Sequence, residues 1–110
     1  MITRIKISRS STGILTKRYK GLRQTLTPNI ILRNALMFSI KNGDRYKNEN
    51  LDTGGTEFQI STLLGSKSNL YKLIIDQYYN MKLKDEEYKK VLCYHIEEGI
   101  KNKSFLKIFN

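Results

Sequence analysis

The chain has 110 residues, of which 39% are hydrophobic, so it can bury a modest core as one domain and leaves no room for a separate catalytic domain. Its single cysteine excludes an intramolecular disulfide, and no apolar stretch reaches the length of a transmembrane helix, so we expect a cytoplasmic protein. The net charge of +10 attracts a polyanion, which favours nucleic acid as the partner over an acidic protein or an anionic membrane surface.

The positive charge is concentrated at the start of the chain. Residues 1–43 hold nine Lys and Arg and no Asp or Glu, whereas the rest of the chain holds eleven basic and ten acidic residues. Within residues 2–8, Ile5 and Ile7 alternate with basic side chains, which predicts a short strand with one basic side. Residues 11–24 separate apolar from basic side chains at helical spacing and predict the first helix.

The most clearly marked helix follows this basic segment. Thr27 suits an N-cap, Pro28 suits the first helical turn because its missing N–H has no intrahelical partner, and Lys41-Asn42-Gly43 ends the helix. Ile30 and Met37 lie opposite the main apolar face, so apolar side chains occur on nearly all sides. We therefore predict a central helix that packs on its own domain and on another subunit of a homo-oligomer.

The second half of the chain contains further helices after a polar segment. Residues 42–69 contain four glycines and predict a long polar loop with at most short structured pieces around Phe58 and the stretch "TLLG". A third helix is expected at 68–81, with an apolar stripe formed by Leu70, Leu73, Ile74 and Met81. A fourth begins near Asp85, where acidic residues suit a helix N-terminus, and its stripe is Tyr88, Val91, Leu92, Ile96 and Gly99. The tail at 104–109 is expected to cover the core.

These elements predict a mainly α, oligomeric protein that forms a single domain over residues 1–110. It is expected to have about four helices and a short basic N-terminal strand, similar to the start of a ribbon-helix-helix protein.

No residue pattern predicts catalysis. His95 and Cys93 lie two residues apart on an expected helix and point in different directions, so they suit neither a base and nucleophile pair nor a metal site. The only Gly-Gly pair lacks the downstream Lys-Ser/Thr of a phosphate-binding loop. We therefore expect no enzyme, cofactor or metal, and we interpret His95 as structural or interfacial and Cys93 as inert.

The basic strand and the helices that follow it are the candidate site. Strands from two subunits can form a ribbon that enters a DNA major groove, and a helix N-terminus can hold a phosphate through its free N–H groups. Thr27 therefore either caps a helix only or also helps to anchor a backbone phosphate. The candidate DNA-binding residues are Arg4, Lys6, Arg9, Lys17, Lys20, Arg23, Thr27 and Asn29.

Four stretches carry a resemblance to a known family: "RIKIS", "LRQTLTPNIILRNALMFSI", "GGTEFQISTLLG" and "HIEEGI", the last followed by Leu106. Together they resemble the DndE family of bacterial DNA phosphorothioation systems, with Thr25 standing where a glycine is expected. The resemblance implies a mostly helical, oligomeric accessory protein that binds DNA and catalyses nothing itself. It implies partners, a sulfurtransferase-like and an ATPase-like subunit, which replace a non-bridging phosphate oxygen with sulfur.

Two other functions remain open on the sequence. A ribbon-helix-helix-type transcriptional regulator would use the same strand but would discriminate strongly between DNA sequences. A protein-binding adaptor would direct its basic surface to an acidic subunit, and it would form complexes without binding DNA at low salt.

Overall fold

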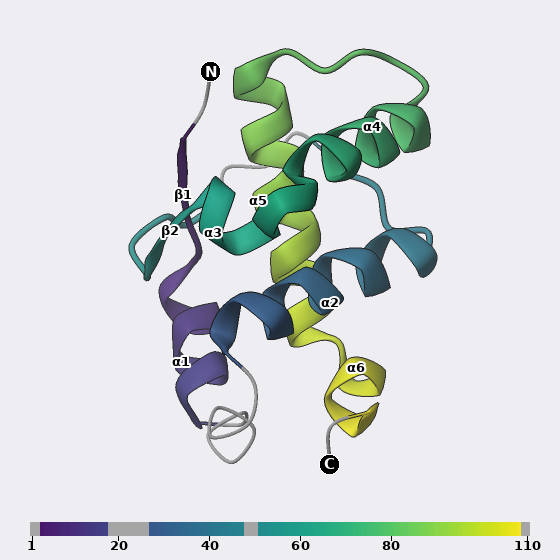
Figure 1. Ribbon diagram of the computed structural model, residues 1–110. Helices are drawn as coiled ribbons and strands as arrows, with labels where there is room; N and C mark the ends of the chain where they lie inside the picture. Colours follow the sequence, from purple (N-terminus) through teal and green to yellow (C-terminus); the bar gives the residue numbers. More distant parts are fainter. Residues whose placement is uncertain (1–2, 18–26, 48–50, 109–110) are drawn as a thin grey trace.

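The computed structural model describes residues 3–17, 27–47 and 51–108. They form a mainly helical domain, as the sequence predicts, and one small two-stranded sheet (Figure 1). In chain order the elements are β1 (Arg4–Lys6), α1 (Arg9–Lys17), α2 (Pro28–Lys41), β2 (Glu57–Gln59), α3 (Ile60–Leu64), a 3-10 turn (Gly65–Lys67), α4 (Ser68–Tyr79), α5 (Asp85–Lys101) and α6 (Lys103–Ile108). The first helix begins at Arg9 rather than Ser11, and residues 18–24 of the expected helix lie outside the described part.

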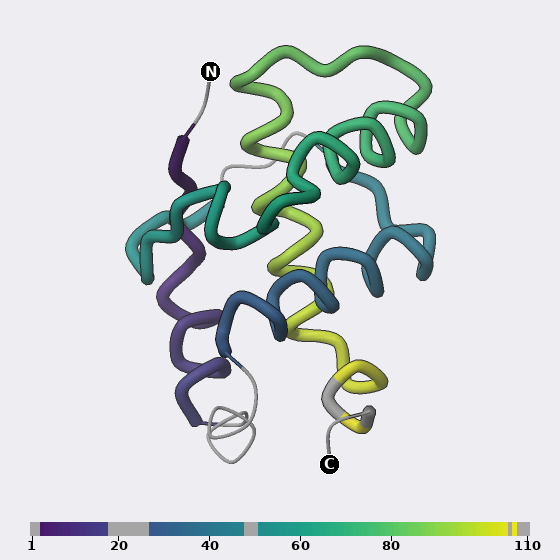
Figure 2. The backbone as a smooth tube through the Cα atoms, viewed as in Figure 1, coloured from purple at the N-terminus to yellow at the C-terminus, as the bar shows by residue number. Residues whose placement is uncertain are grey.

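The centre of the fold is the crossing of α2 and α5 (Figures 1 and 2). At the crossing Gly99 of α5 lies against the backbone of Ala35 in α2, so closely that any side chain at position 99 would collide with it. Residues Val91 to Glu97 of α5 are all buried. The predicted central position of α2 is confirmed, and its own domain already half-buries Ile30 and Met37.

The predicted N-terminal strand is present, but its partner differs from the expectation. β1 pairs antiparallel with β2 of the same chain, in the register Arg4↔Gln59, Ile5↔Phe58 and Lys6↔Glu57. The ribbon expected from the sequence would instead pair β1 with a strand from a second subunit. The pairing extends past the strands because Ile7 N–H donates to the Thr56 carbonyl at 3.1 Å and Gly55 N–H donates to the Ile7 carbonyl at 2.9 Å.

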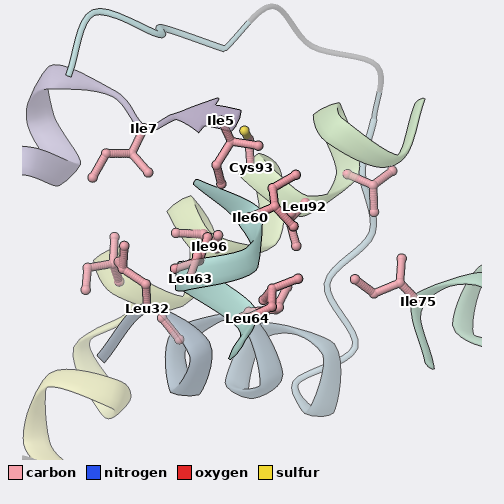
Figure 3. Packing of buried hydrophobic residues seen from close by; sticks show 14 of the residues in the cluster. Ile5, Ile7, Leu32, Ile60, Leu63, Leu64, Ile75, Leu92, Cys93 and Ile96 are labelled. Atoms are coloured by element: carbon pink, nitrogen blue, oxygen red, sulfur yellow. The ribbon is translucent and has the colours of Figure 1, made fainter. Parts of the chain in front are cut away.

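The short structured pieces expected around Phe58 and residues 62–65 are present as β2 and α3, and the segment is regular from Glu57 onward rather than a loop to residue 69. Ile60, Leu63 and Leu64 of α3 are buried, and Figure 3 shows them between β1 and α2. Their burial against the core offsets the low helix signal of the glycine-containing sequence. Arg33 of α2 fixes the end of α3, since its guanidinium donates to the carbonyls of Leu63 and Thr62.

The third predicted helix exists as α4, but it presents a different face to the core. The expected stripe residues Leu70, Leu73 and Met81 are 49%, 65% and 51% exposed. Ile75 is fully buried instead, and Tyr71 and Tyr79 pack beside it against the core. The helix also ends at Tyr79, because the next residue, Asn80, adopts a left-handed conformation with φ 55°.

The tail covers the core as predicted. Phe105 of α6 is 2% exposed, and its ring centroid lies 5.4 Å from that of Phe38 in α2. The fourth predicted helix is α5, which begins at Asp85 as expected, and all five residues of its predicted stripe are buried: Tyr88, Val91, Leu92, Ile96 and Gly99.

Candidate nucleic-acid interface

Four of the predicted DNA-binding residues lie on two consecutive elements. Arg4 and Lys6 are exposed on β1, while Ile5 between them is buried. Arg9 begins α1, Lys17 ends it, and both are exposed. Figure 1 shows β1 continuing directly into α1 at one side of the molecule. We call the four exposed side chains of Arg4, Lys6, Arg9 and Lys17 the basic face.

Two carboxylates from beyond residue 43 lie against the basic face. Arg4 Nη1 lies 3.5 Å from Glu57 Oε2, and both side chains are about half exposed, so this ion pair contributes little to stability. Asp52 accepts hydrogen bonds at 3.0 Å from the backbone N–H groups of Arg9 and Gly54. These two bonds lower the pKa of Asp52, so its carboxyl group remains charged at neutral pH. No local sequence pattern predicts the contacts of Glu57 with Arg4 and of Asp52 with Arg9, because these partners lie far apart along the chain.

A buried carboxylate anchors the junction between β1 and α1. Glu97 of α5 is 4% exposed, and its Oε1 accepts a hydrogen bond from Ser8 N–H at 2.6 Å. Its Oε2 accepts from the Ser8 hydroxyl at 2.8 Å and from the Ser11 hydroxyl, and it lies 3.3 Å from Lys101 Nζ. Ser8 Oγ in turn accepts from Ser11 N–H at 3.0 Å and so caps α1. Ser8 and Glu97 belong to two of the stretches that carry the family resemblance.

The start of α2 has the predicted geometry without the predicted side-chain bond. Thr27 stands at the N-cap with φ −72° and ψ 154°, and Pro28 begins the helix. The Thr27 hydroxyl makes no capping hydrogen bond, and the side chain is exposed. Asn29 is half-buried. Lys20 and Arg23, the other predicted contacts, lie outside the described residues, and contact with DNA stays a prediction for all eight candidate residues.

His95 belongs to a buried hydrogen-bond chain. Tyr46 N–H donates to the Tyr79 hydroxyl at 3.0 Å, which lies 2.5 Å from His95 Nε2, while His95 Nδ1 lies 2.7 Å from Ser39 Oγ. Ser39 donates its single hydroxyl proton to Asp44 Oδ2 at 2.9 Å, so His95 carries its own proton on Nδ1 and accepts from Tyr79. Burial lowers the pKa of His95 to about 4, which keeps it neutral at pH 7. His95 is therefore a structural residue, as predicted.

Cys93 is placed for packing. Its Sγ lies 3.7 Å from the Lys6 carbonyl, and burial raises the pKa of the thiol to about 12. The thiol is therefore protonated at neutral pH and is a poor nucleophile. Within the described residues, no group of three or more His, Cys, Asp or Glu side chains is placed to hold a metal ion. Nor does this part of the chain contain a helix long and apolar enough to span a membrane.

Comparisons with known proteins identify the family. The family model described as "DNA sulphur modification protein DndE" matches residues 4–106. Among solved structures, DndE from Escherichia coli B7A, which is involved in DNA phosphorothioation modification, is similar with 29% identity and a TM-score of 0.72, covering 91% of this chain and 94% of that one. A glycine-to-lysine mutant of DndE involved in DNA phosphorothioation is similar with 27% identity, a TM-score of 0.72 and the same coverage. The curated proteins include no match. The chain therefore belongs to the DndE family of DNA sulphur modification proteins.

Proposed function

We propose that this chain is a DNA-binding accessory subunit of a DNA phosphorothioation complex. It holds duplex or nicked DNA through phosphate contacts made by the basic face. The observation that carries the proposal is the placement of Lys6 and Lys17, whose exposed side chains form no ion pair within the described residues, together with Arg9, which lies between them in the chain near Asp52. Unpaired cations on adjoining elements suit a phosphate backbone, which binds through charge rather than through base sequence. Membership of the DndE family supports the sulfur modification context.

The chain carries no catalytic step in this proposal. Its sulfurtransferase-like and ATPase-like partners supply the chemistry, as the family resemblance implies. The protonated Cys93 thiol and the fully hydrogen-bonded His95 support this assignment. A Cys93→Ser variant that folds normally should leave sulfur incorporation into DNA unchanged. Loss of incorporation in that variant would give Cys93 a role as a sulfur carrier.

The pairing of β1 argues against the regulator alternative. A ribbon-helix-helix protein reads DNA with a ribbon whose strands come from two subunits, whereas β1 pairs with β2 of its own chain. The direct test of the DNA-binding proposal is a gel-shift series with intact, nicked and single-stranded DNA of several sequences. We expect binding that depends weakly on sequence. A protein that binds none of these DNAs at low salt, yet still forms complexes with other subunits, would be the adaptor instead.

A second experiment locates the DNA on the surface. We expect Lys17→Ala plus Lys20→Ala to weaken binding and to flatten the slope of log affinity against log salt by about 0.9 for each phosphate that is no longer neutralised. The matched control is Lys41→Ala plus Lys82→Ala, which removes the same charge. α2 runs from the side of α1 to the opposite side of the molecule, where Lys41 ends it (Figures 1 and 2). An equal effect of both pairs would show that net charge, and not the basic face, drives binding.

A further inference from the structure

An open hollow of about 270 Å³ lies beside β1, and it receives residues from both halves of the chain. Its lining is formed by Arg4, Ile5, Lys6, Thr53, Glu57, Lys89 and Cys93. Three of these side chains are cationic and one is anionic, so the lining carries a net charge of +2 (three positive minus one negative). Lys89 is the member that the charge distribution along the sequence does not suggest, because it belongs to the near-neutral second half.

The position of Lys89 follows from the packing of α5 against β1. Lys89 and Cys93 are four residues apart on α5 and therefore lie on one face of that helix. Cys93 Sγ contacts the Lys6 carbonyl at 3.7 Å, so this face of α5 is turned toward β1. Lys89 thus stands beside β1 and adds an ammonium group next to the basic face.

The charges of the hollow are only partly neutralised. Glu57 is the cross-strand partner of Lys6 in the sheet register, but its carboxylate forms its ion pair with Arg4. No ion pair among the described residues engages Lys6 or Lys89. Two unpaired ammonium groups at a concave surface, with the exposed Thr53 on its wall, suit a phosphate group, which accepts several hydrogen bonds and carries at least one negative charge.

We propose that this hollow binds one backbone phosphate of DNA between Lys6 and Lys89, so that α5 is part of the DNA-binding surface. This inference rests on the proposed DNA-binding function, and it extends the basic face by a residue from a different part of the chain. DNA is the source of the phosphate because the hollow is continuous with the basic face: Arg4 and Lys6 belong to both.

Neighbouring lysines on α5 provide a matched test. Lys89 lines the hollow, whereas Lys90 is the next residue, is exposed, and points about 100° away around the helix. Lys89→Gln and Lys90→Gln therefore change the net charge equally. We would measure the affinity of each variant for a nicked duplex at salt concentrations from about 50 to 200 mM. Lys89→Gln should weaken binding and flatten the salt slope by about 0.9, Lys90→Gln should do much less, and Lys89→Arg should restore the slope.

A second measurement on the wild type distinguishes DNA from free inorganic phosphate as the ligand of the hollow. Backbone amide signals of residues 4–6 and 89 should shift in a nuclear magnetic resonance titration with a short duplex, and less with equimolar inorganic phosphate. Signals that respond only to inorganic phosphate would overturn the assignment to DNA.

Failure of this inference and failure of the proposed function give different results. If Lys17→Ala plus Lys20→Ala weakens DNA binding while Lys89→Gln has the same effect as Lys90→Gln, the phosphate site in the hollow is wrong and DNA binding by the basic face is retained. If the wild type binds no DNA, both are wrong. In that case a loss of complex formation with an acidic protein partner in Lys89→Gln would assign the hollow to that partner.

Discussion

Removal of the Glu97 carboxylate should loosen the elements that carry the basic face. Glu97→Ala leaves two buried donors, the Ser8 N–H and the Ser11 hydroxyl, without an acceptor, and the Ser8 hydroxyl keeps only Ser10 Oγ at 3.1 Å. Each unsatisfied buried donor costs about 1–3 kcal/mol, and the contributions do not add in full. The ion pair with Lys101 adds little, because the Lys101 side chain is 45% exposed. We expect the free energy of unfolding to fall by about 3–5 kcal/mol, a large share of the stability of a small domain.

Urea unfolding of three variants would test this reasoning. Glu97→Gln keeps the shape and one acceptor oxygen, so we expect a smaller loss of about 1–3 kcal/mol. Glu98→Ala removes the same charge from the exposed neighbouring position, where a contact is worth little, and should cost at most about 1 kcal/mol. Hydrogen exchange in Glu97→Gln should accelerate in α1 before it does in α2. The anchor role is refuted if Glu97→Ala destabilises no more than Glu98→Ala, or if exchange accelerates equally throughout.

The core and the surface support three further predictions. Gly99→Ala should destabilise the fold by about 1–3 kcal/mol, because its methyl group collides with the backbone of α2. Gly13→Ala should stabilise it by about 0.5–1 kcal/mol, because the new methyl group meets open space within a helix. Thermal unfolding should therefore show a lower melting temperature for the first variant and a higher one for the second. The pKa of His95 is lowered to about 4 in the folded protein, so the unfolded state binds more protons between about pH 4 and 6.5. Stability should therefore fall by about 2 kcal/mol from pH 7 to pH 5, and His95→Asn should remove this dependence in urea unfolding. If α2 holds an oligomer, Met37→Lys should lower the mass measured by light scattering and Leu73→Lys should not; the reverse result would place the contact on the exposed residues of α4.

The helix positions are predictable where the signals are local. Thr27 and Pro28 mark the start of α2, and the acidic turn at Asp85 marks the start of α5; both depend on capping and dipole effects within a few residues. The predicted apolar stripe of α5 is also correct, because this helix crosses the centre of the fold and buries the stripe along its whole length. Ser39 and His95 interrupt these stripes because each satisfies the other within the core.

The face of α4 is not predictable from hydrophobicity alone. Leu73 is more apolar than Tyr79, yet Tyr79 faces the core and Leu73 faces solvent. The tyrosine hydroxyl finds two hydrogen-bond partners there, the His95 ring and the Tyr46 N–H, so its polar group is satisfied while its ring is packed. Such partners come from other elements, and no pattern within residues 68–81 contains them. The same limit applies to the partner of β1, which lies more than fifty residues away along the chain.

Basic and acidic residues are therefore less separated in the folded protein than they are along the sequence. Glu57 returns to β1 and pairs with Arg4, whereas Lys6 in the same strand has no such partner among the described residues. A DNA phosphate that contacts Arg4 must compete with the Glu57 carboxylate. Its binding to Arg4 should therefore release fewer counterions than binding of a phosphate to Lys6. We accordingly expect Arg4→Ala to flatten the salt slope of DNA binding less than Lys6→Ala, and Glu57→Gln to raise affinity. If Arg4→Ala has the larger effect and Glu57→Gln none, the ion pair is not maintained in the free protein, and the sequence-based count of charges describes the surface better than the structure does.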